Sequence, residues 1–189
     1  MRKIILLDHV TLDGFAAGPA GEMDWILLSD EMFGFVGELT QDADAALYGR
    51  KTYEMMDSYW PTAGDQPNAT KHDVDHSQWY NRVEKLVLSN TMKDIKKDKT
   101  KFISDEVSKQ IADLKKQSGK NILMLGSLTA GHFLMAENLI DEFWLFVNPI
   151  LLGKGIPVFS RIPDKTTLAL AGSRVFPNGV ISLNYTVSR

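Results

Sequence analysis

Short apolar runs alternate along most of this chain with longer segments in which apolar residues recur every three or four positions. Residues 122–125 are apolar throughout, which is typical of a strand covered on both faces inside a largely parallel sheet. Similar runs predict further strands at residues 3–11, 45–48, 85–89, 102–103 and 143–147. Because parallel neighbours need crossover connections, which are usually helices, the alternation favours an α/β fold.

The segments with helical spacing predict helices that bury one face against the sheet. They are residues 26–40, residues 50–59, a segment capped by Ser104 or Asp105, and residues 128–138. Residues 60–78 contain two prolines, a glycine and many polar side chains, which predict an exposed loop. Residues 12–24 contain three glycines and a proline, which predict a long flexible connection able to cover a site.

The last apolar runs, residues 168–176 and 180–187, flank Asn178-Gly179, which is a strong hairpin signal. We therefore predict a three-layer α/β fold with a mixed, mostly parallel β-sheet, flanking helices and a C-terminal antiparallel hairpin. A chain of 189 residues, 44% of them hydrophobic, can bury one substantial core, so residues 1–189 are expected to form a single domain.

Two predicted strands end at a glycine that is followed directly by a predicted helix, at Gly49 and at Gly126. The first-turn amides and the positive end of such a helix lie at the carboxyl edge of the sheet, where α/β proteins bind anions. Ser127 is expected to cap the second helix through its hydroxyl. Neither corner contains the dinucleotide-binding or P-loop glycine motif, so a purely structural corner is the alternative.

Composition and charge narrow the range of partners. A net charge of −3 and a pI of about 5.8 give no cationic surface for nucleic acid. The chain has no cysteine, which excludes disulfides and thiolate chemistry. The apolar start at residues 4–7 is too short for a signal peptide, and no apolar run has membrane-spanning length. We therefore expect a cytoplasmic protein, without a membrane partner, that acts on a small molecule.

His72 and His76 are four residues apart, a spacing that in a helix places two imidazoles on one face, as in some metal sites. They fall in the predicted loop with no obvious further ligand, so no metal is predicted. His9 and His132 are more typical of core or rim positions than of catalytic bases.

Five motifs, taken together, carry a resemblance to a known family. They are Thr11-Leu12-Asp13-Gly14-Phe15, Gly49-Arg50-Lys51-Thr52-Tyr53-Glu54 with Tyr59-Trp60-Pro61, Val87-Leu88-Ser89, Leu139-Ile140-Asp141-Glu142, and Pro149-Ile150-Leu151-Leu152-Gly153-Lys154-Gly155. With them the chain resembles the dihydrofolate reductase-like superfamily over nearly its whole length. The branch is the one that contains the RibD C-terminal domain, the reductase domain of bacterial riboflavin biosynthesis. That family usually has Gly-Gly where this chain has Gly126-Ser127.

The resemblance implies an NADPH-dependent reductase whose cofactor lies across the carboxyl ends of the strands. The residues that match cofactor-binding positions are Ala16, Ala17, Gly49, Arg50, Lys51, Thr52, Ser89, Asn90, Thr91, Gly126, Ser127, Leu128 and Thr129. Among them, Arg50 would meet the 2′-phosphate that distinguishes NADP from NAD. The alternatives are that Arg50 is a solvated surface arginine, that Thr52 only stabilises its helix, and that residues 89–91 form an ordinary polar turn.

On the substrate side, Trp25 and Asp30 keep the spacing of the tryptophan and the acidic residue of dihydrofolate reductases, and the resemblance assigns them to catalysis. A carboxyl group in an apolar cleft can assist protonation of a ring nitrogen. The alternative is that Asp30 only favours the first turn of a helix through its negative charge. Riboflavin-pathway relatives carry basic residues for the ribose phosphate of the substrate. Between Asp30 and Ala45 the chain has no arginine, lysine or histidine, which counts against a phosphorylated substrate there.

The expected function is hydride transfer from NADPH to a small pterin- or pyrimidine-type heterocycle, such as the riboflavin-pathway compound 5-amino-6-(5-phosphoribosylamino)uracil. The alternatives are dihydrofolate reductase activity, a catalytically inactive NADP-binding sensor, and an interaction domain without a cofactor. A homodimer is also expected, and Trp144 and Phe146 either contribute to its contact or fill the core.

Overall fold

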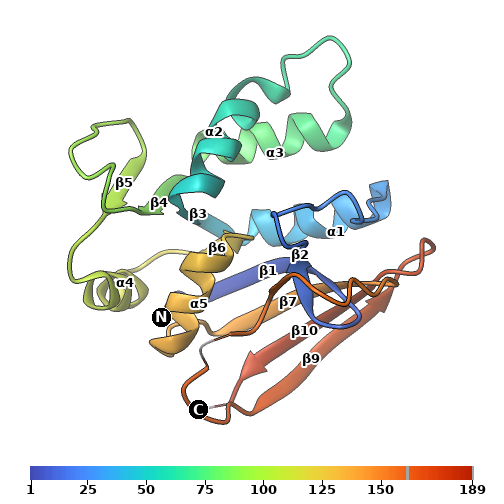
Figure 1. The fold of residues 1–189 in the computed structure, drawn as a ribbon. Coiled ribbons are helices and arrows are strands. Elements are labelled where there is room, and N and C mark those ends of the chain that lie inside the picture. The colour runs from blue at the N-terminus through green and yellow to red at the C-terminus, as the bar shows by residue number, and fades with distance from the viewer. Residues whose placement is uncertain (161, 189) are drawn as a thin grey trace.

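The computed structural model describes residues 1–160 and 162–188, which form an eight-stranded sheet with helices on both faces (Figure 1). The strands lie in the order β5-β4-β3-β6-β1-β7-β10-β9. Their bounds are β1 (Ile4–Thr11), β3 (Ala43–Gly49), β4 (Glu84–Leu88), β5 (Thr100–Ile103), β6 (Asn121–Leu125), β7 (Glu142–Asn148), β9 (Leu168–Val175) and β10 (Ile181–Val187). Neighbours from β5 to β7 are parallel, whereas β10 pairs antiparallel with β7 and β9. The predicted mixed sheet and its terminal hairpin are confirmed.

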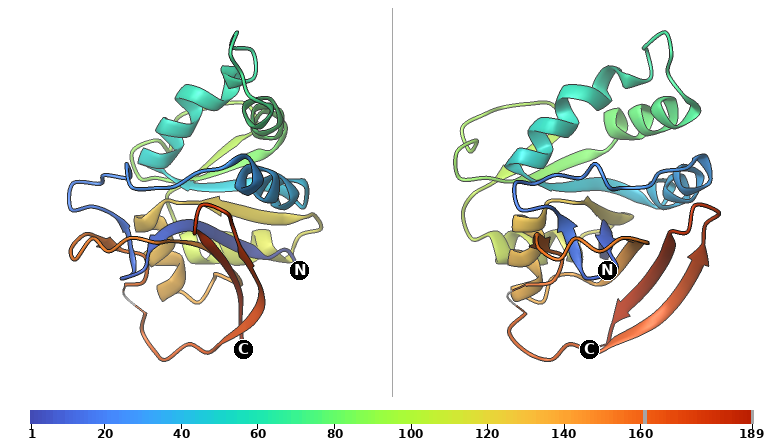
Figure 2. Two further views of the ribbon diagram at one scale, coloured as in Figure 1. Left: turned by 90° about the vertical axis from the view of Figure 1, so that its right-hand side faces the viewer. Right: turned by 45° about the vertical axis from the view of Figure 1, so that its right-hand side comes forward.

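The helices form the two outer layers (Figure 2). They are α1 (Asp30–Gln41), α2 (Arg50–Ala63), α3 (Lys71–Arg82), α4 (Val107–Lys116) and α5 (Leu128–Ala136). Side chains of β1 alternate between the faces: Ile5 and Leu7 pack in the core with α1–α3, and Ile4 and Leu6 pack in the core with α4 and α5. No helix of the described residues is both long and apolar enough to span a membrane.

The prediction of an exposed loop at residues 60–78 is wrong, because α2 and α3 occupy most of this segment. Pro61 lies near the end of α2, where a missing amide interrupts little of the helix. Thr70 caps α3 by accepting a hydrogen bond from the Asp73 amide, while the Asp73 carboxylate accepts one from the Thr70 amide at 2.9 Å. The buried face of α3 includes the polar residue His76, so its apolar pattern is weak in the sequence.

Two further helix starts differ from the prediction. Helix α1 begins one turn later than predicted, because the Ser29 hydroxyl accepts a hydrogen bond from the Met32 amide at 3.3 Å and caps the helix there. Helix α4 begins after Glu106, whose backbone is left-handed with a φ of 43°. Neither Ser104 nor Asp105 therefore caps α4.

The connection after β1 is tied to a second loop. It contains β2 (Phe15–Ala17), which pairs antiparallel with β8 (Ile156–Pro157). The Asp13 carboxylate accepts hydrogen bonds from the Thr11 hydroxyl at 2.6 Å and from the Gly153 amide at 2.7 Å. At Gly155 an added Cβ would lie 2.3 Å from the Ala17 carbonyl oxygen, so only glycine allows this approach. These contacts hold the predicted flexible connection in place.

Candidate active site at the carboxyl edge of the sheet

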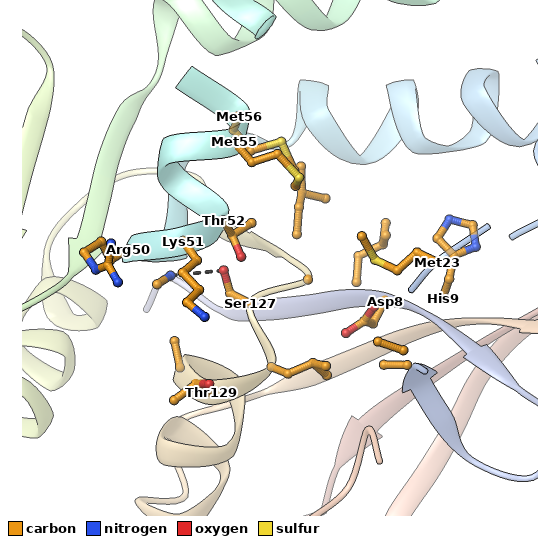
Figure 3. Close-up of a pocket in the computed structure, with 18 of the residues that line it drawn as sticks. Asp8, His9, Met23, Arg50, Lys51, Thr52, Met55, Met56, Ser127 and Thr129 are labelled. Carbon is orange, nitrogen blue, oxygen red and sulfur yellow. Dashed lines mark hydrogen bonds between the residues drawn. The ribbon is translucent and has the colours of Figure 1, made fainter. Parts of the chain in front are cut away.

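A cavity of about 1120 Å³ opens where the parallel strands end (Figure 3). Gly49, Leu88 and Leu125, the last residues of β3, β4 and β6, line it, and Leu7 and Asp8 of β1 complete that edge. Because the helices after β3 and β6 begin at the same edge, the first turns of α2 and α5 face the cavity. An edge of this kind is the usual ligand site of an α/β sheet.

All thirteen residues that the resemblance assigns to the cofactor line this cavity. They come from β2, from the start of α2, from the turn after β4 and from the corner between β6 and α5. These segments are distant in the sequence and meet because β3 pairs with both β4 and β6.

Ser127 joins the two glycine corners, and the prediction that its hydroxyl caps α5 is wrong. Gly126 and Ser127 both have left-handed backbones, with φ of 59° and 68°. This turn directs the Ser127 hydroxyl towards the other corner, where it accepts a hydrogen bond from the Gly49 amide at 3.0 Å. The first-turn amides of α5 have no side-chain cap from Ser127, so they are available to an anion.

Replacing Ser127 with alanine is expected to lower the free energy of unfolding by about 1–2 kcal/mol, because the partly buried Gly49 amide loses its acceptor. Urea denaturation of the variant measures this loss. The exposed Ser118 provides the matched control, since Ser118→Ala should change stability by less than about 0.5 kcal/mol. Equal stability of the two variants would show that the hydrogen bond contributes nothing.

Arg50 begins α2 at the cavity, and its guanidinium is held by Glu54. Nη1 of Arg50 lies 3.0 Å from each oxygen of the Glu54 carboxylate, and the Arg50 side chain is 41% exposed. Figure 3 shows Arg50, Lys51 and Thr52 near Ser127. Positive charge and hydroxyl groups therefore gather at the end of the cavity formed by the glycine corners.

Residues 89–91 form a hydrogen-bonded turn that also lines the cavity. A polar turn and a contact with the cofactor are therefore compatible interpretations of this segment. The Ser89 hydroxyl accepts from the Thr91 amide at 3.3 Å and lies 3.3 Å from the Thr91 hydroxyl. The Ser89 amide donates to the Ile103 carbonyl at 3.0 Å, which fixes the turn against β5.

The two residues predicted to be catalytic do not line the cavity. Asp30 is exposed in the first turn of α1, so the expectation that its carboxyl group lies in an apolar cleft is wrong. The cause is the Ser29 cap, which starts the helix at that point. Trp25 is buried, and its indole nitrogen donates to the Glu22 carbonyl at 3.2 Å.

Asp8 on β1 is the acidic residue that does line the cavity, and we did not predict it. Its Oδ2 atom is buried without a hydrogen-bond partner. Burial raises the pKa of the Asp8 carboxyl to about 7, and a hydrogen bond from the His9 amide opposes this only partly. The signal in the sequence was the charged residue itself, since Asp8 interrupts an apolar run inside a strand predicted to be covered on both faces.

His9 lies next to Asp8 and also lines the cavity. Its ring stacks on Phe146 with centroids 5.1 Å apart, and Nδ1 lies 3.4 Å from the side-chain amide of Asn148. Burial lowers the pKa of His9 to about 4, so its imidazole is neutral at pH 7.

His72 and His76 are one turn apart on α3 and contact aromatic rings. His72 stacks on Phe33 with centroids 4.0 Å apart, and His76 lies 4.0 Å from the Trp60 ring. Burial lowers the pKa of both histidines, that of His76 to about 3. Among the described residues, no group of three His, Asp or Glu side chains is arranged to hold a metal ion.

The amino-acid sequence is similar to one protein family and to two individual proteins. Residues 2–182 match the model of the RibD C-terminal domain family. The uncharacterized protein YyaP of Bacillus subtilis is 35% identical over 186 residues, which cover 97% of this chain and 94% of YyaP. The uncharacterized protein YwjB of the same organism is 29% identical over 183 residues, which cover 95% of each chain.

Solved structures share the fold. A candidate riboflavin biosynthesis protein from Shewanella sp. PV-4 has a TM-score of 0.74 and 26% identity over 99% of both chains. A pyrimidine reductase-like protein from Corynebacterium diphtheriae has a TM-score of 0.68 and 15% identity over 100% of this chain and 92% of that one. The diaminohydroxyphosphoribosylaminopyrimidine deaminase/5-amino-6-(5-phosphoribosylamino)uracil reductase of Thermotoga maritima has a TM-score of 0.68 and 16% identity, over 99% of this chain and 57% of that one.

Proposed function

The chain belongs to the RibD C-terminal domain family, and on this basis we propose that it is an NADPH-dependent reductase that transfers hydride to a small heterocyclic substrate. The observation that carries the proposal is the meeting of two glycine corners, joined by the hydrogen bond from Gly49 to Ser127, at one cavity. Two structural neighbours, one named a pyrimidine reductase-like protein and the other a deaminase/uracil reductase, support the reaction class.

The residues around the cavity fit a reduced dinucleotide phosphate. The first-turn amides of α5 suit a pyrophosphate, and Arg50 and Lys51 suit a 2′-phosphate. The hydroxyls of residues 89–91 suit the adenosine end, and the small side chains of Ala16 and Ala17 leave room for the nicotinamide. When bound, NADPH supplies the hydride, while the protein orients it and excludes water.

Replacing Arg50 with alanine is expected to weaken NADPH binding by about 10- to 100-fold, because a charge-assisted bond to the 2′-phosphate contributes about 1.5–3 kcal/mol. NADH lacks that phosphate, so it should bind the wild-type protein and Arg50→Ala with equal affinity. Isothermal titration calorimetry measures both affinities. Arg82→Ala, an exposed arginine on α3 that does not line the cavity, is the matched control. If the wild-type protein binds NADPH and NADH equally well, this role of Arg50 is wrong.

The reaction itself is tested by following NADPH oxidation with pterin and pyrimidine acceptors, dihydrofolate included. Turnover with one of these compounds supports the reductase. Tight NADPH binding without turnover on the whole panel would favour a cofactor-binding sensor, and failure to bind NADPH at all would overturn the proposed function.

A further inference from the structure

The cavity has a second end, which we call the acceptor end, formed by Asp8, His9, Met23, the cavity-lining side chains of α1 and α3, and Trp60 of α2. Figure 3 shows Asp8, His9 and Met23 on the side of the cavity away from Arg50, with Asp8 the nearest of them to Ser127. Since the proposed cofactor residues gather around the glycine corners, the acceptor end is where the second reactant of the proposed reductase would bind.

Within the part of the chain that the structure describes, the acceptor end has no fixed positive charge. Among the described residues, the lysine and the arginine that line the cavity are Lys51 and Arg50, and both lie at the other end. The histidines of the acceptor end are neutral at pH 7, because burial lowers the pKa of His9 to about 4, that of His76 to about 3, and that of His72 as well. A phosphate dianion would therefore lose its hydration here without gaining a cation, which is costly.

The acceptor end offers flat and adaptable apolar surfaces. Phe33 of α1 lies parallel to His72, with 11° between the ring planes, and Trp60 of α2 lies against His76. Met23 and Met32 line the same space. Aromatic faces and methionine side chains are well suited to a planar ring.

Asp8 presents an unsatisfied hydrogen-bonding atom to this apolar space. Its Oδ2 atom has no partner. The preceding residue, Leu7, accepts a hydrogen bond from the Gly126 amide at 3.0 Å, so Asp8 lies beside the corner at which the two ends of the cavity meet. A nitrogen of a bound ring would satisfy the buried carboxyl oxygen.

We propose that the acceptor is an uncharged, flat heterocycle without a phosphate group, and that Asp8 hydrogen-bonds to its reducible nitrogen and protonates it. This inference rests on the proposed function and names its substrate class. As the carbon of a C=N bond accepts hydride, its π electron pair moves to the nitrogen, and a new N–H bond forms while the O–H bond of Asp8 breaks. The carboxylate regains its proton from water, and the cofactor leaves as NADP⁺.

The substrate class is tested with two matched compounds, 5-amino-6-(ribosylamino)uracil and its 5′-phosphate, titrated calorimetrically into protein saturated with NADP⁺. The compound without the phosphate should bind at least as tightly as its ester. Tenfold tighter binding of the ester, or no binding of either compound to the saturated protein, would overturn the inference. If NADP⁺ itself does not bind, the proposed function fails instead, so the two failures are distinguishable.

Introducing a cation tests the charge argument directly. Leu28 lines the cavity and is 55% exposed, so Leu28→Arg should fold and should strengthen binding of the 5′-phosphate at least tenfold. Leu27 is 42% exposed and does not line the cavity, so Leu27→Arg is the control. Equal effects of the two variants would contradict the argument.

The role of Asp8 is tested with Asp8→Asn in the same titration at pH 6. The variant keeps the shape of the side chain but has no acidic proton. We expect its affinity for the unphosphorylated compound to fall at least tenfold, and NADP⁺ binding checks that the variant is folded. Unchanged affinity for that compound would remove Asp8 from the substrate site.

Discussion

Replacing Asp8 with asparagine is expected to stabilise the protein by about 2–4 kcal/mol at pH 8 and to change its stability little at pH 4. The reason is the buried Oδ2 atom, which has no hydrogen-bond partner. Burial raises the pKa of the Asp8 carboxyl from 3.8 to about 7. At pH 8 folding must therefore hold a carboxylate in a poorly solvated position, and the neutral amide avoids that cost.

The sign of the pH dependence follows from proton binding. Between pH 3.8 and about 7 the folded protein holds a proton on Asp8 that the unfolded chain has released. The contribution of this carboxyl to stability therefore falls as pH rises through that range and is fully lost above it. Guanidinium denaturation at pH 4, 6 and 8 should show a flatter profile for Asp8→Asn than for the wild-type protein. The exposed Asp24 gives the control, since Asp24→Asn should follow the wild-type profile. A variant less stable than the wild type at pH 8 would contradict the assignment.

A gain in stability combined with a loss of substrate binding in Asp8→Asn is the pattern of a residue kept for function. A buried carboxyl oxygen without a hydrogen-bond partner is destabilising in the free protein, and a ligand that supplies the partner removes this cost. The denaturation and titration experiments on this variant therefore both test the effect of the unsatisfied Oδ2 atom of Asp8, the first on stability and the second on substrate binding.

Replacing Phe146 with alanine is expected to lower the free energy of unfolding by about 3–5 kcal/mol, the usual cost of truncating a fully buried aromatic residue. Phe146 on β7 is 0% exposed. Its ring lies 5.1 Å from His9, 6.3 Å from Phe35 and 6.0 Å from Phe176, so truncation would empty a space surrounded by aromatic rings. Urea denaturation measures the loss.

The control for this truncation is Phe159→Ala, because Phe159 is 42% exposed. It should cost about 1–2 kcal/mol, less than Phe146→Ala, since a large part of the removed surface is already in water. Similar losses for both variants would mean that Phe146 is not part of the packed core. Because Phe146 also lines the cavity, its truncation should weaken binding at the acceptor end as well.

The sequence predicted the residues of the proposed cofactor end of the cavity better than those of the proposed acceptor end. The motifs around Gly49 and Gly126 are continuous, so their residues could be named one by one, and the structure gathers them around one cavity. The acceptor end has no continuous motif. The prediction of Asp30 rests on the resemblance and on its spacing from Trp25, and the structure leaves Asp30 exposed on α1.

The apolar pattern by itself determined the eight strands of the large sheet, their largely parallel arrangement and the terminal hairpin, because these depend on which residues near one another in the chain must be buried. It did not predict the short strands β2 and β8. It missed α3, whose buried face includes the polar His76. Only the tertiary structure decided that Ser127 binds Gly49, that His72 and His76 contact aromatic rings, and that the Oδ2 atom of Asp8 has no hydrogen-bond partner. The physical reason is that burial and hydrogen-bond satisfaction depend on elements far apart in the chain, which meet only when helices cover the sheet.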